Sequence, residues 1–191
     1  STNVNIGTTD DVGGVTMQDT TIVDAGSGDI TVSAGEDILL GQLMTTSTTP
    51  VDVSTTAGSI LDVNGATVNI DAPEASLMAA DHIGQITDLF DGTGDALEVN
   101  LGTALDSAEI TNAGGTVYID FGATLPTFTN PIVVDSDGAA SAIIETDVDI
   151  DLSGGLPGFM TADAADGIGF YSGGTLTIPA AGYTRTAPIW L

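Results

Sequence analysis

The sequence lacks cysteine and lysine altogether and holds a single arginine, Arg185, against 27 acidic residues, which gives a formal net charge of −26. Without basic side chains, the chain cannot neutralise nucleic-acid phosphates or bind anionic lipid through a polybasic patch. Without cysteine, it forms no disulfide, thiolate metal site or thiol nucleophile. Catalysis by lysine, by cysteine or by a cluster of arginines is excluded for the same reason. No apolar run approaches the roughly 20 residues that span a bilayer, so we expect no membrane insertion.

Charged residues make up only 15% of the chain, below the roughly 25% of typical soluble domains, so base is missing rather than acid in excess. Hydrophobic residues reach 42%, too many for a disordered acidic chain, and 191 residues suit one domain with a core. The scarcity of sites for trypsin-like proteases favours an extracellular location; the alternative is the cytosol of a halophile. The first residue is Ser1, which indicates either a processed mature protein or a piece of a longer chain.

Apolar and polar residues alternate in short runs separated by glycine-rich turns, a pattern typical of strands with one buried face. The runs are Ile30–Val32, Val51–Val53, Val68–Ile70, Leu97–Leu101, Val117–Phe121, Val148–Leu152 and Leu176–Ile178. Helical signals are weak, and the best of them, Ala72–Ala80, suits a strand equally well. The pattern predicts an all-β chain, either a solenoid or a sandwich.

Internal repetition favours the solenoid. The offsets are 23 and 23 for Ala34, Ala57 and Ala80, and 22 and 23 for Ile38, Ile60 and Ile83. A repeat of about 23 residues without helices corresponds to one turn of a parallel β-helix, and the chain length then predicts seven or eight turns. The alternative is a two-sheet β-sandwich completed by a donor strand, Ser1–Gly7, exchanged between partners.

The segment Gly28–Gly41, together with Ala57–Ile60 and Ala80–Gly84, resembles the degenerate repeats of filamentous haemagglutinin-like exoproteins. Those are long bacterial surface proteins, and the resemblance implies a right-handed parallel β-helix that serves as a fibrous stalk or adhesin. It covers about a third to a half of the chain, and its motif is apolar alternation with Ala-Gly-x-Ile corners. The chain is far shorter than proteins of that family.

Charge is distributed unevenly along the sequence. All 27 acids lie in residues 1–166, whereas residues 167–191 contain the only arginine and four of the nine aromatic residues. We therefore predict an acidic solenoid body, 1–166, and an acid-free aromatic C-terminal segment, 167–191. The segment is either a cap over the end of the solenoid or a tail that docks on a neighbouring subunit. The residues predicted to make the docking contact are Arg185, Ile189, Trp190 and Leu191.

Aspartates in glycine-containing turns are the candidate metal ligands. Ca²⁺ binds six to eight oxygens, often from Asp side chains and loop carbonyls, and this chain has almost no internal cation to offset its charge. No turn matches an EF-hand, so two interpretations stay open: a solvated polar face, or at least one specific Ca²⁺ site. The candidate ligands are Asp91 and Asp95, followed by Asp135 and Asp137. The only histidine, His82, is expected to be a hydrogen-bonded corner residue.

These features predict a structural protein rather than an enzyme. The first hypothesis is a subunit or stalk segment of an extracellular microbial fibre that assembles head to tail with copies of itself. The second is an adhesin module that binds glycan or a host surface through exposed loops. The third, a carbohydrate-active β-helix with paired carboxylates, is disfavoured because the chain has few aromatic residues and almost no basic ones.

Overall fold

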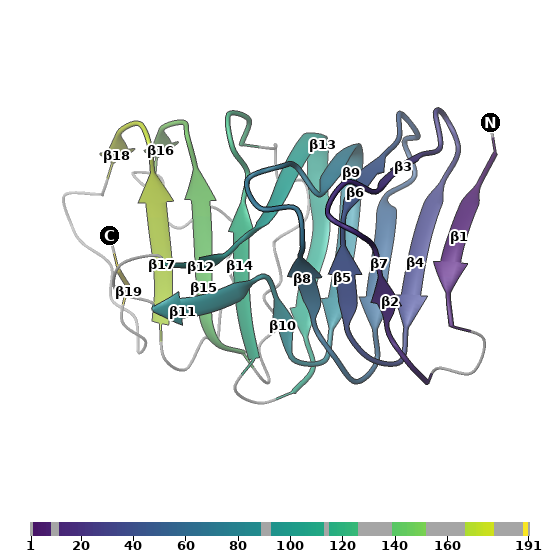
Figure 1. Ribbon diagram of the computed structural model, residues 1–191. Helices are drawn as coiled ribbons and strands as arrows, with labels where there is room; N and C mark the ends of the chain where they lie inside the picture. Colours follow the sequence, from purple (N-terminus) through teal and green to yellow (C-terminus); the bar gives the residue numbers. More distant parts are fainter. Residues whose placement is uncertain are drawn as a thin grey trace.

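The computed structural model describes residues 2–8, 12–88, 93–112, 115–125, 139–151, 167–177 and 189–190. These residues contain no helix, and their strands stack as a parallel β-solenoid of about five turns. Figure 1 shows coil following coil along one axis, from the purple N-terminal strand to the yellow C-terminal strands. The predicted parallel β-helix is therefore confirmed.

Strands of successive coils form columns, and each column is one face of the solenoid. The first face consists of β1 (Val4–Gly7), β4 (Ile30–Ala34), β7 (Val51–Thr55), β9 (Ile70–Ala79) and β13 (Leu97–Ile110). The second face consists of β2 (Val15–Thr16), β5 (Ile38–Leu40), β8 (Ile60–Asp62), β10 (His82–Ile83), β14 (Gly115–Asp120), β15 (Ala139–Thr146), β17 (Gly167–Ser172) and β19 (Ile189–Trp190). The third face consists of β3 (Ile22–Asp24), β6 (Gln42–Met44) and the first residues of β9 and β13.

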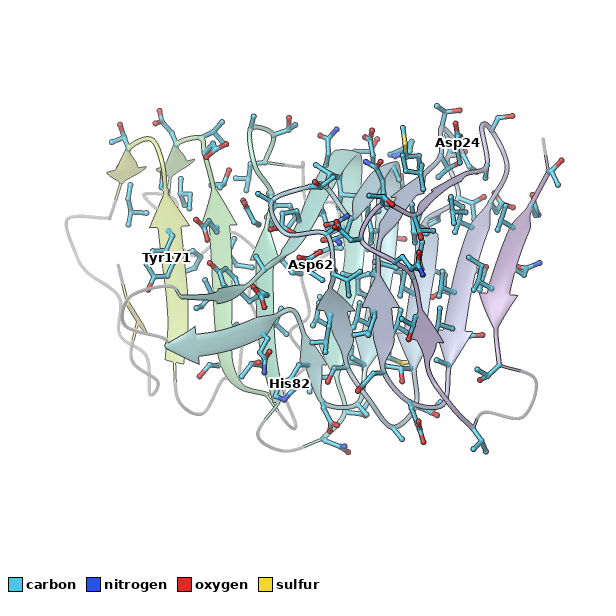
Figure 2. The ribbon with its side chains drawn as sticks, in the orientation of Figure 1. Asp24, Asp62, His82 and Tyr171 are labelled. Atoms are coloured by element: carbon cyan, nitrogen blue, oxygen red, sulfur yellow. The ribbon has the colours of Figure 1, made fainter. Side chains whose placement is uncertain are left out.

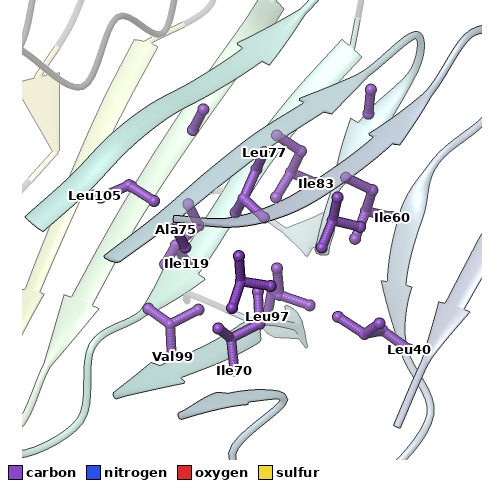
Figure 3. Packing of buried hydrophobic residues seen from close by; sticks show 14 of the residues in the cluster. Leu40, Ile60, Ile70, Ala75, Leu77, Ile83, Leu97, Val99, Leu105 and Ile119 are labelled. Carbon is purple, nitrogen blue, oxygen red and sulfur yellow. The ribbon is translucent and has the colours of Figure 1, made fainter. Parts of the chain in front are cut away.

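Alternate residues of these strands point inward and form one continuous core. Val32 of β4 and Val53 of β7 are ladder partners, and neither is exposed to solvent. Figure 3 shows Leu77 of the first face near Ile60 and Ile83 of the second face inside the solenoid. Full burial of an aliphatic side chain of this size contributes roughly 1.5–3 kcal/mol, so stacking of the coils supplies the cohesion that no single coil has.

The isoleucine repeat read from the sequence corresponds to the actual register. Ile38 pairs with Ile60, and Ile60 pairs with Ile83. The alanine alignment is wrong, because Ala34 pairs with Thr55 rather than with Ala57. The physical reason is that the corner between β4 and β5 is one residue shorter than the corner between β7 and β8.

An antiparallel hairpin, β11 (Gln85–Asp88) and β12 (Thr93–Asp95), interrupts the fourth coil. Strand β14 pairs with β10 through Ile83 and Val117 and with β13 through Leu97 and Ile119, so only Tyr118 lies between the two ladders. The hairpin is thus inserted between neighbouring positions of a coil. It lengthens the step from Ile83 to Val117 to 34 residues, which explains why the repeat drifts in the second half of the sequence.

The hairpin lies against the outer side of the second face, and in Figure 1 β11 runs across the coil strands. Beneath this region Tyr118 and Ile143 are buried in a small cluster outside the main core, with Ala96 and Tyr171. The chain leaves the coil at Gly84, whose φ is +62° and where a Cβ would lie 2.3 Å from the Tyr118 carbonyl oxygen. Glycine is the residue that fits such a close approach in the left-handed region.

The predicted seven or eight turns exceed the number of complete turns. After β14, the described residues add only β15, β17 and β19 to the second face and a separate parallel pair, β16 (Ile150–Asp151) and β18 (Leu176–Thr177). The length divided by the period overestimates complete turns because later coils contain inserted residues. The alternative β-sandwich is wrong, because β1 pairs in parallel with β4 of its own chain.

Candidate functional site

The first coil leaves one edge of every face open within the described residues. Strands β1, β2 and β3 each pair with a following coil and have no strand on their other side. The Val4 amide donates to the Asp29 carbonyl at 2.8 Å and the Thr8 amide to the Ser33 carbonyl at 3.3 Å. Because alternate residues of a parallel strand bond to the same neighbour, the amide of Asn5 faces away from β4, toward the open edge.

The apolar core also reaches the surface at this end. Val4, Ile6 and Val23 are only partly buried. The ladder partners of Val4 and Ile6, which are Ile30 and Val32 of the next coil, are 1% and 0% exposed. The side chains of the first coil therefore have the composition of core residues without complete cover.

Charge at the open end is negative. Asp19 and Asp24 of the first coil are exposed, and the described part of the chain contains no lysine or arginine. Asp24 borders a hollow of about 660 Å³ that also touches Thr2 and Val4, and Figure 2 shows this aspartate near the N-terminal end. A partner at this end would have to bring apolar surface and little negative charge.

The predicted docking residues lie partly within the described chain. Ile189 and Trp190 form β19, which pairs in parallel with β17 through Ile168 and Gly169. This strand is the last one of the second face, at the opposite end from β2. Arg185 and Leu191 lie outside the described residues.

A second candidate site is an acidic cleft of about 480 Å³ on the side of the solenoid. Its carboxylates are Glu98 from the start of β13, Asp120 from the end of β14, and Asp147 just after β15. Glu98 and Asp120 are ladder partners on adjacent coils. The cleft therefore follows a row of acids that continues from coil to coil.

Glu98 is the most perturbed acid of this row. Burial, reinforced by the negative charges of Asp62, Asp120 and Asp95, raises the pKa of Glu98 to about 8. Its Oε2 atom is buried and has no hydrogen-bond partner among the described residues. Glu98 consequently keeps its proton near neutral pH, and the row carries less charge than its composition indicates.

Asn69 holds this part of the wall together. Its side chain is fully buried, and its Nδ2 donates to the Leu40 carbonyl at 3.0 Å and to Asp62 Oδ1 at 2.7 Å. Its Oδ1 accepts the amide of Glu98 at 2.9 Å. One side chain thus connects three successive coils, and its bonds satisfy polar groups that burial would otherwise leave unpaired.

Of the predicted calcium ligands, only Asp95 lies in the described chain. It is an exposed residue of β12 and contributes to the field around Glu98. Asp91, Asp135 and Asp137 lie outside the described residues. Among residues that are described, no three His, Asp or Glu side chains form a group that could hold a metal ion.

His82 is hydrogen-bonded, as predicted. Its Nδ1 lies 2.9 Å from Thr116 Oγ1 and accepts the Thr116 amide at 3.1 Å, so it links β10 to β14. Sequence reasoning missed Glu98, Asp120 and Asn69. The alternation of Leu97–Leu101 indicates that Glu98 faces outward, but the residues beside it depend on the register across the inserted hairpin.

Comparison of the chain with protein-family models, curated proteins and solved structures finds no match. The similarity to filamentous haemagglutinin-like proteins thus rests on the repeat and on the solenoid fold. None of the described secondary structure is a helix long and apolar enough to cross a bilayer.

Proposed function

We propose that the chain is a structural segment of an extracellular microbial surface fibre, similar in kind to the stalks of filamentous haemagglutinin-like proteins. Its coils would provide a rod, and the rod would lengthen by addition of further coils at its end. The expected partners are copies of the same chain, with Ca²⁺ or other cations screening the acids between them. This proposal needs no catalytic residue.

The open first coil is the observation that carries the proposal. It presents strand edges with unpaired backbone groups beside partly exposed core residues, Val4, Ile6 and Val23. Such an edge is a template for another strand, and proteins that stay monomeric usually cover it or place proline or lysine along it. No lysine is available in this chain, and β1 contains no proline.

Blocking the open edge tests this proposal. Asn5→Pro removes the outward-facing amide of β1 without removing a hydrogen bond to β4, and Asn5→Ala is the matched control that keeps the amide. Electron microscopy of the purified chain should show filaments for the wild type and for Asn5→Ala. The concentration needed for filaments should rise several-fold for Asn5→Pro. Monomeric particles of the wild type at every concentration would overturn the proposal.

A second candidate, an adhesin module, is favoured by the acidic cleft. A groove of about 480 Å³ lined by Glu98, Asp120 and Asn100 offers hydrogen-bond acceptors and an amide to sugar hydroxyls. Binding of the isolated chain to a glycan array, lost in Asp120→Asn and kept in Asp19→Asn, would support this function. Absence of any bound glycan would reject it.

A further inference from the structure

One column of inward-facing side chains runs through the whole second face. Ladder pairing connects Val15, Ile38, Ile60, Ile83, Val117, Ala142, Ile168 and Ile189 in that order. Every member is aliphatic, and the side chains of the six from Val15 to Ala142 are at most 8% exposed. The column is therefore a continuous apolar ladder along the axis.

The two ends of this column have matching structures. At one end β2 has β5 on one side and no described strand on the other, and at the opposite end β19 has only β17. Both are two-residue parallel strands in which the first residue, Val15 or Ile189, occupies the inward column. A coil that ends in Ile189 can therefore continue into a coil that starts with Val15 with no change of side-chain chemistry.

We propose that β19 of one copy pairs in parallel with β2 of the next copy, with Ile189 beside Val15 and Trp190 beside Thr16. This inference rests on the proposed end-to-end assembly and specifies its junction. The second face would then run unbroken from one subunit to the next. It is a heterologous contact that does not close on itself and so generates a filament.

Charge complementarity favours this junction over other end-to-end contacts. The first coil exposes Asp19 and Asp24, and a second acidic body facing it would be repelled. Residues 167–191 contain no acid and include Arg185, four positions before Ile189. The C-terminal segment is therefore the part of a second copy that approaches the acidic end without repulsion.

Cysteine cross-linking tests the junction directly, because the natural chain contains no cysteine. Adjacent strands lie about 4.8 Å apart, within the Cα separation of about 4.4–6.8 Å that a disulfide requires. The double variant Thr16→Cys/Trp190→Cys is oxidised under assembly conditions and analysed on a non-reducing gel. It should give a ladder of covalent trimers and larger species, whereas either single variant can give dimers at most.

A second pair guards against loss of assembly through the Trp190 substitution. Val15→Cys/Ile189→Cys tests the same register from the inward side. The control is Asn5→Cys/Trp190→Cys, which places one cysteine on the first face at the same end and should stop at dimers. Filaments that give no ladder with either junction pair would overturn this inference and leave the proposed function standing. Absence of filaments from the wild type would overturn both.

Discussion

Glu98 shows how the fold changes the chemistry of a single residue. The acid faces outward from the start of β13, yet its Oε2 is shielded from solvent and surrounded by other acids. The raised pKa follows chiefly from the loss of hydration and secondarily from the charges of Asp62, Asp120 and Asp95. Proton binding by Glu98 is consequently linked to folding.

Stability should fall as Glu98 is forced to ionise. Below about pH 4.5 the carboxyl is protonated in both states, and above that pH the unfolded chain ionises while the folded protein keeps its proton until about pH 8. The free energy of unfolding should therefore decrease over this range, by an amount on the order of 1–2 kcal/mol for a partly exposed group. Chemical denaturation of Glu98→Gln at several pH values should show a flatter profile than the wild type.

The control for this measurement is Asp19→Asn, which removes one exposed negative charge of the first coil. It should shift stability slightly and leave the slope between pH 4.5 and 8 as in the wild type. Identical slopes for wild type and Glu98→Gln would show that Glu98 does not carry the linked proton.

The sequence identifies part of this site. Asp95 is recognisable because aspartates beside glycines are typical of acidic turns, and the structure brings it near Glu98. Glu98 itself is one outward residue in an alternating run, and nothing local distinguishes it from Asn100. Its neighbours Asp62 and Asp120 lie 36 and 22 positions away, so the cluster exists only through coil stacking.

At the scale of elements, the β11–β12 hairpin is separable from the coil that carries it. Deletion of residues 85–96 joins Gly84 to Leu97, and the step from Ile83 to Val117 shrinks from 34 to 22 residues. That length equals the step from Ile38 to Ile60. A Cβ on Gly84 would lie 3.1 Å from the Leu97 amide nitrogen, so the two ends already meet.

We expect the deletion variant to keep the solenoid and to lose part of its stability. Circular dichroism should remain that of a β protein, and the midpoint of thermal unfolding should fall by several degrees because Tyr118 and Ile143 become exposed. A second deletion variant with Ile143→Thr should recover solubility if the exposed cluster is the cause. An unfolded deletion variant would show that the hairpin is required for the coil.

The coils differ in how far they are predictable. Ile38, Ile60 and Ile83 identify the register because strands and corners there have nearly constant length. The alanine alignment fails because a single extra corner residue shifts one face against the other. Beyond Leu101 an insertion of hairpin length removes the period from the sequence, although the inward column continues in space.

At the scale of the whole molecule, the charge of −26 acts against the compact state. Aligned coils bring acids of the same column close together, as Glu98 and Asp120 illustrate. No lysine is present to offset this repulsion. Cations from solution are the remaining source of compensation.

Thermal stability should depend on ionic strength and on calcium. Raising NaCl from 0.01 to 0.15 M shortens the screening length from about 30 to about 8 Å, so the melting temperature should rise by several degrees. CaCl₂ at matched ionic strength should raise it further, and a chelator should reverse that extra gain. A melting curve that responds equally to both salts and ignores the chelator would restrict the effect to general screening.

The arrangement of the Asn69 hydrogen bonds has a consequence for mechanical load. The strands lie across the axis, so tension along the rod pulls directly on the bonds between coils, which can open one coil at a time (Figure 1). The side chain of Asn69 reaches Leu40 on one side and Glu98 on the other. Tension at that corner is therefore shared among three coils, and separating one coil requires loosening its neighbours as well.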